Sequence, residues 1–129
     1  MAKQFTQIVG FVLVVVGILG FIMGEKMLLG LHFSTLHNSI HILSGAVLAY
    51  LGFKGNANNQ RLGAQIFGVV YGLVAILGFL KIGHLPEQMV SNPFRLDLNL
   101  NPMYNIIHSV IAAWGLWAGF AKKTVPAAS

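Results

Sequence analysis

The sequence predicts an all-α, polytopic membrane protein in which four transmembrane helices form a bundle built from two repeated hairpins. Three observations lead to this fold class. Of the 129 residues, 56% are hydrophobic and only 9% are charged, whereas a water-soluble domain carries about 25% charged residues. The few charges leave four uncharged runs of 18 or 19 residues, and the chain contains an internal repeat.

Each uncharged run has the length of a membrane span. A hydrocarbon core about 30 Å thick needs roughly 20 helical residues at a rise of 1.5 Å per residue. A soluble bundle would need charged outer faces, which these runs lack. No small-x-small cleavage site follows the first run, so we expect it to be retained as a span. The four predicted spans are residues 5–23, 36–53, 62–80 and 103–121.

The internal repeat relates the two halves of the chain. Residues 65–79 match residues 7–21 at nine of fifteen positions, with an offset of 58. Residues 103–120 match residues 36–53 at six of eighteen positions, with an offset of 67. A repeated pair of spans returns to the same side of the membrane, so the halves have parallel topology and a pseudo-two-fold axis along the membrane normal. We predict a single domain over 1–129 with repeat one at 5–54, repeat two at 62–121 and a short cytoplasmic tail at 122–129.

The distribution of charge predicts the orientation. If the spans alternate, one side of the membrane receives five basic and no acidic residues, and the other receives three of each. The positive-inside rule then places both termini in the cytoplasm of a bacterial inner (plasma) membrane. No basic run with interleaved aromatic residues indicates nucleic-acid binding. The five cytoplasmic charges are Lys3, Lys54, Arg61, Lys122 and Lys123.

Two related motifs stand at the start of the second and fourth spans, LHNSIHILSG at 36–45 and NPMYNIIHSVIAAWG at 101–115. This pattern resembles a family of small four-helix bacterial membrane proteins that is catalogued as a domain of unknown function. Its members show His-Asn-x-x-His in span two and Asn-x-x-His in span four. The resemblance implies the four-helix fold and no particular activity. It covers His37, Asn38 and His41 in the first half and Asn105 and His108 in the second.

The histidines of these motifs are predicted to meet. His37 and His41 are four residues apart and lie on one helix face. His41 and His108 occupy equivalent positions in the two repeats, and Tyr104 stands where the first repeat has His37. A histidine in a span turns toward protein, a cavity or a ligand because lipid cannot solvate it. We therefore expect His41 and His108 to form the centre of the bundle near its outward face.

One possible role for the pair is structural. In this interpretation, the imidazoles of His41 and His108 hydrogen-bond Asn105, Asn38 or backbone carbonyls, with Tyr104 as a further polar contact. Such contacts commonly hold membrane helices together, at about 0.6–2 kcal/mol each.

Two other roles involve a ligand. His41 and His108 could be the axial ligands of haem b or another tetrapyrrole, with Gly45 and Ala112, one turn further along, making room for the macrocycle. Alternatively, imidazole nitrogens suit zinc or copper. The predicted metal ligands are His37, His41 and His108, with His84 or Glu87 in reserve.

Sequence signatures of enzymes are missing. The chain has no cysteine, no phosphate-binding loop and no nucleophile elbow, and its three acidic residues lie outside the predicted spans. The sequence therefore favours an integral inner-membrane protein with a structural or accessory role. Its expected partners are the lipid bilayer and a homo-oligomer or larger membrane complex. The alternative is a histidine-ligated haem, pigment or metal-binding protein that carries a cofactor or transfers electrons.

Overall fold

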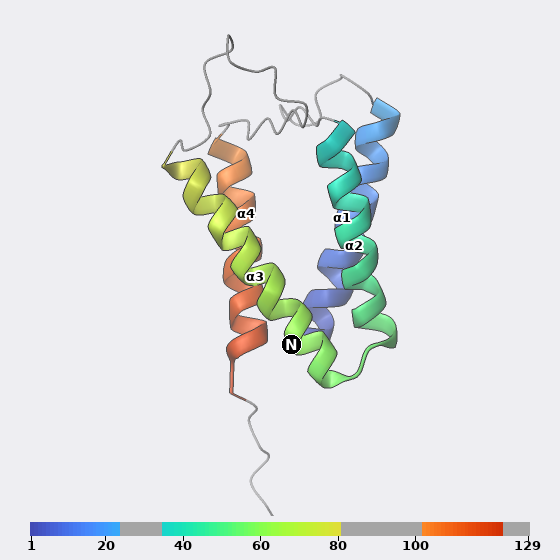
Figure 1. The fold of residues 1–129 in the computed structure, drawn as a ribbon, viewed down its shortest axis with the longest axis vertical. Coiled ribbons are helices and arrows are strands. Elements are labelled where there is room, and N and C mark those ends of the chain that lie inside the picture. Colours follow the sequence, from blue (N-terminus) through green and yellow to red (C-terminus); the bar gives the residue numbers. More distant parts are fainter. Residues whose placement is uncertain (24–34, 81–101, 123–129) are drawn as a thin grey trace, which may run out of the picture.

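The computed structural model describes residues 1–23, 35–80 and 102–122, and these residues form four α-helices without any strand (Figure 1). This confirms the all-α class and the predicted number and order of helices. The helices are α1 (Ala2–Met23), α2 (Thr35–Lys54), α3 (Ala57–Phe79) and α4 (Pro102–Phe120).

α3 begins five residues before the predicted span because a side chain caps its first turn. Asn56 is the N-cap, and its Oδ1 accepts a hydrogen bond of 2.9 Å from the backbone N–H of Asn59. This bond satisfies one of the amide groups that have no partner within a helix. Only Gly55 and Asn56 separate α2 from α3, so the connection between the two halves is short.

The helices pair as two hairpins, α1 with α2 and α3 with α4, and the hairpins diverge from a shared end (Figure 1). The hairpins contact each other chiefly through α1, whereas α2 and α4 have no Cα atoms within 8 Å of each other. We call the end where α1 begins and α2 joins α3 the closed end. The end where α2 and α4 begin is the cluster end.

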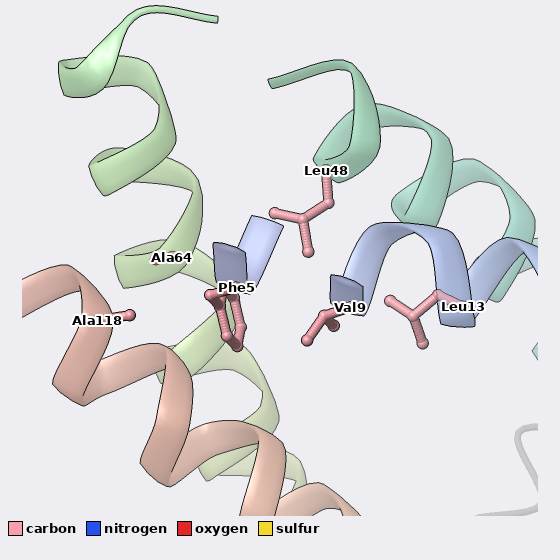
Figure 2. Close-up of a cluster of buried hydrophobic side chains, with 6 residues drawn as sticks. All are labelled: Phe5, Val9, Leu13, Leu48, Ala64 and Ala118. Atoms are coloured by element: carbon pink, nitrogen blue, oxygen red, sulfur yellow. The ribbon is translucent and has the colours of Figure 1, made fainter. Parts of the chain in front are cut away.

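A hydrophobic core occupies the closed end and draws on all four helices (Figure 2). The ring of Phe5 is fully buried and meets the ring of Trp114 edge-on, with centroids 5.3 Å apart. Aromatic pairs prefer this geometry. The core side chains are Phe5, Val9, Leu13, Leu48, Ala64 and Ala118.

The internal repeat reappears as a repeated hydrogen bond within each hairpin. Nε2 of Gln7 donates to the carbonyl oxygen of Gly52 at 3.0 Å, and Nε2 of Gln65 donates to that of Gly119 at 2.9 Å. Both carbonyls lie in the last turn of a helix, where they have no partner within the helix. The glutamine of the first helix therefore caps the second helix in each half.

Close helix packing is repeated as well. A Cβ on Gly10 would lie 2.8 Å from the Cα of Ala49, and a Cβ on Gly68 would lie 2.6 Å from the backbone nitrogen of Leu116. Real Cβ atoms do not approach backbone this closely, so each glycine is required for the contact. Gly72 differs, because a Cβ there would meet only the Cβ of Ala112, at 3.7 Å.

Two of the four helices, α1 and α3, are long and apolar enough to cross a membrane. α2 and α4 do not meet this criterion, and both have His, Asn and Ser side chains in their first two turns. Four crossings and the positions of the termini therefore stay predictions.

Candidate functional site

The predicted histidines gather at the cluster end, on α2 and α4. We define the histidine cluster as His37, His41, Tyr104 and His108. The side chains of His41 and Tyr104 are buried, at 7% and 6% exposure, and those of His37 and His108 are half-buried. The cluster thus consists of two pairs of residues at equivalent positions of the repeat. His37 is equivalent to Tyr104, and His41 is equivalent to His108.

Within the cluster, α2 contributes two adjacent imidazoles. The ring centroids of His37 and His41 are 4.2 Å apart, with the ring planes at 60°. One helical turn separates the two residues, so their side chains emerge from the same face. His108 of the other hairpin lies within electrostatic range of both rings.

The hairpins meet at this end through side chains rather than backbone. The ring of His37 lies 6.0 Å from that of Tyr104, at 38° between planes. These two residues occupy equivalent positions of the repeat. A pseudo-two-fold axis would bring equivalent positions together in this way, and the axis itself stays a prediction.

His108 also has an aromatic neighbour within its own hairpin. The ring of Tyr71 meets it edge-on, with centroids 5.3 Å apart, and Phe67 stacks on Tyr71 at 6.0 Å. Nδ1 of His108 is buried without a hydrogen bond to the described residues. The sequence-based prediction missed Tyr71. The usable signal was its i, i+4 spacing from Phe67, which places two aromatic rings on one face of α3.

The two asparagines lie differently from the prediction. Oδ1 of Asn38 occupies the space that a Cβ on Gly20 would need, and Oδ1 of Asn105 does the same at Gly78. Their amide oxygens therefore face α1 and α3 inside their own hairpins, whereas the sequence predicted contacts to a histidine of the opposite half. The reason is steric, because a glycine on the neighbouring helix leaves a space that only the amide fills.

Gly45 and Ala112 do not provide the expected room for a macrocycle. A Cβ on Gly45 would lie 2.8 Å from the carbonyl oxygen of Gly10 and 2.8 Å from the Cβ of Leu13, so α1 fills this space. Ala112 is buried and faces Gly72 of α3. Both small residues serve helix packing within a hairpin, and this arrangement does not fit a tetrapyrrole beside the histidines.

A three-histidine metal site is not formed by the part of the chain that the structure describes. No group of three or more His, Cys, Asp or Glu side chains within these residues is placed to hold a metal ion. The reserve ligands His84 and Glu87 lie outside the described residues. Metal binding by His37, His41 and His108 therefore stays a prediction.

Comparison with known proteins adds no relative. No family model, no curated protein and no solved structure matches the chain. The resemblance to the four-helix family of unknown function accordingly stays a prediction, and the histidine cluster must be interpreted from its own geometry.

Proposed function

We propose that the chain is an integral protein of the bacterial inner membrane that crosses the bilayer four times, with both termini in the cytoplasm. In this proposal it is a structural or accessory component, and its histidine cluster joins the two hairpins near the outward face.

The observation that carries the proposal is the apolar outer surface of α2 and α4. α2 and α4 expose large side chains at equivalent positions of the repeat, including Leu43 at 69% and Val110 at 63% exposure. A soluble monomer rarely exposes contiguous apolar patches of more than a few hundred Å². The matching exposed pairs are Ile40 with Ile107, Leu43 with Val110, Tyr50 with Trp117, and Phe53 with Phe120.

The interior complements this surface, because small and polar residues are buried where the helices meet. Asn38, His41 and Asn105 are buried, as are several glycines. Membrane helices associate in this way because lipid is as apolar as leucine, so close packing and hydrogen bonds replace the hydrophobic effect between helices. Large apolar residues outside and small or polar residues inside together favour four spans.

Contacts at the closed end support the proposed orientation. Nε of Arg61 donates a hydrogen bond of 2.7 Å to the carbonyl oxygen of Gly119, and Nη2 donates one of 3.3 Å to that of Ala121. Arg61 thus places its positive charge at the C-terminus of α4, where the helix dipole favours it. Lys3 occupies the equivalent position in the first repeat. Among the described residues, the closed end therefore gathers Lys3, Lys54, Arg61 and Lys122, which the positive-inside rule would assign to the cytoplasm.

Cysteine labelling tests the proposal directly, because the natural chain has no cysteine. Asn58→Cys places a thiol on an exposed residue at the closed end, and Ser91→Cys places one between the predicted spans three and four. On intact spheroplasts, a membrane-impermeant maleimide is expected to label Ser91→Cys at once and Asn58→Cys only after permeabilisation. Ser129→Cys should behave like Asn58→Cys.

Two results would refute this topology. One is labelling of Asn58→Cys in sealed cells to the same extent as Ser91→Cys. The other is release of the protein from membranes by alkaline carbonate, which leaves integral proteins in the pellet.

A further inference from the structure

The two imidazoles of α2 are spaced like neighbouring ligands of one metal ion. A metal bound at about 2.0–2.1 Å to a ring nitrogen lies about 3.2 Å from the ring centroid. Two such rings at right angles around the metal have centroids about 4.5 Å apart, and tetrahedral angles require about 5.2 Å. The observed separation of His37 and His41 is 4.2 Å, close to the right-angled arrangement. We propose that His37 and His41 form a two-nitrogen chelate for a divalent transition-metal ion of the copper(II) type.

The spacing in sequence supports a chelate because i, i+4 histidines are one of the simplest ways for a helix to present two nitrogens to one metal. Both residues lie in the first two turns of α2, which begins at Thr35. The site is therefore near the end of the helix rather than at its centre. Water at the membrane surface can complete the coordination of an ion held there.

The ligand atoms and the position on the helix determine which kind of metal ion fits the site. Neither His37 nor His41 offers the oxygen ligands that hard cations such as Mg²⁺ and Ca²⁺ need. The N-terminus of a helix also disfavours a cation through its dipole. An ion bound here must gain its affinity from neutral imidazoles. Copper(II) binds nitrogen most tightly in the divalent series and prefers right-angled, tetragonal coordination.

The second hairpin supplies an internal control. At the equivalent positions α4 has Tyr104 and His108, so only α2 carries an adjacent histidine pair. The chelate needs no third histidine, which agrees with the absence of a three-residue metal group among the described residues. The inference goes beyond the proposed structural role, and its failure would leave the four-span topology untouched.

The test is a copper(II) titration of the full chain, purified in detergent, in a background that carries His32→Asn and His84→Asn. These two changes remove the imidazoles outside the described residues. We expect one copper per chain, with electron paramagnetic resonance showing coupling to at least two imidazole nitrogens. His37→Asn should weaken binding at least about 100-fold, because losing a ligand costs more than losing a supporting residue. His108→Asn should retain one copper per chain.

A rescue separates ligation from folding. Adding Tyr104→His to the His37→Asn variant creates the same i, i+4 arrangement on α4 and is expected to restore one copper per chain, with affinity within about tenfold of the starting protein. Circular dichroism must show equal helix content in all variants. Unchanged copper affinity in His37→Asn, or a loss that Tyr104→His does not rescue, would overturn the chelate.

Discussion

The two hairpins are alike in the contacts inside each of them and different in the contacts between them. Within the hairpins, Gln7 and Gln65 make the same hydrogen bond, to Gly52 and Gly119. Between the hairpins, Phe5 packs against Trp114, yet the equivalent positions hold Gly63 and Val47. A contact inside a hairpin must be satisfied twice, so both copies keep it. Between the hairpins, one pair of equivalent positions forms an aromatic contact and the other pair holds a glycine and a valine, so the two copies differ.

The largest expected effect comes from overfilling the close contact inside a hairpin. Gly10→Val and Gly68→Val each drive a side chain into the backbone of the neighbouring helix, which cannot move aside as a side chain can. Each change should destabilise the bundle by about 3 kcal/mol, at the upper end of the range for overpacking. The measurement is unfolding in mixed micelles followed by circular dichroism. Gly72→Ala is the matched control and should change stability by less than about 1 kcal/mol. Strongly unequal effects of Gly10→Val and Gly68→Val would break the comparison.

Emptying the contact between the hairpins should have the next largest effect. Phe5→Ala removes a fully buried ring and should cost about 2–3 kcal/mol. This is at or below the soluble-protein range for Phe→Ala, because in lipid mainly the cavity contribution remains. Gly63 is the equivalent position in the other half. Gly63→Ala brings a Cβ to 3.0 Å from Cδ1 of the Leu51 side chain, and this side chain can shift. It should cost less than about 1 kcal/mol. A loss from Phe5→Ala no larger than that from Gly63→Ala would show that the ring of Phe5 does not hold the hairpins together.

The repeated glutamine caps should produce smaller and equal effects. Gln7→Ala and Gln65→Ala each remove one hydrogen bond to a carbonyl in the last turn of a helix. Such a bond contributes about 0.5–1.5 kcal/mol. Each carbonyl also has a second donor, Gln60 at 3.3 Å from the oxygen of Gly52 and Arg61 at 2.7 Å from that of Gly119, so neither change leaves the carbonyl without a partner. Gln60→Ala added to Gln7→Ala should increase the loss, because it removes the second donor to Gly52. Clearly unequal losses from Gln7→Ala and Gln65→Ala would contradict the equivalence of the two caps.

The smallest effect is expected on the outer surface. Leu43→Ala and Val110→Ala shorten exposed side chains at equivalent positions, and each should change stability by less than about 0.5 kcal/mol. If this face contacts lipid, the shortened side chain is still surrounded by lipid chains, so no contact with protein is lost. A loss of 2 kcal/mol or more from either change would mean that this face is covered by protein, and cross-linking through a cysteine at position 43 would then identify the partner.

The helices could be predicted from the sequence because charge and length restrict where a span can lie. The uncharged run 36–53 agrees with α2 to within one residue at each end. The run 62–80 began too late, since Arg61 is part of α3 and interacts with the end of α4. A prediction that ends each span at the first charged residue leaves Arg61 out of the helix. The helix nevertheless includes it, because its guanidinium group reaches the carbonyl groups at the end of α4.

The site was less predictable because the repeat shows which residues are equivalent in the two halves but not which way their side chains point. The offset of 67 pairs His41 with His108 and His37 with Tyr104. It does not say which of these pairs lies at the axis, since that depends on how each helix is rotated within its hairpin. In the structure the amides of Asn38 and Asn105 lie against Gly20 and Gly78 of the same hairpin, and the repeat alone does not say that these positions face each other.

The two-residue connection between α2 and α3 has a consequence for the order of folding. Every close contact of α1 with α2 joins residues that precede the connection, and the bond from Gln7 to Gly52 already closes the first hairpin. Domains and their parts can fold in order as the ribosome delivers them, from the N-terminus onward. The first hairpin can therefore insert and pack while α3 is still being synthesised. A second hairpin that forms later would meet a surface already in place, to which α1 contributes Phe5, Val9 and Leu13 of the core at the closed end.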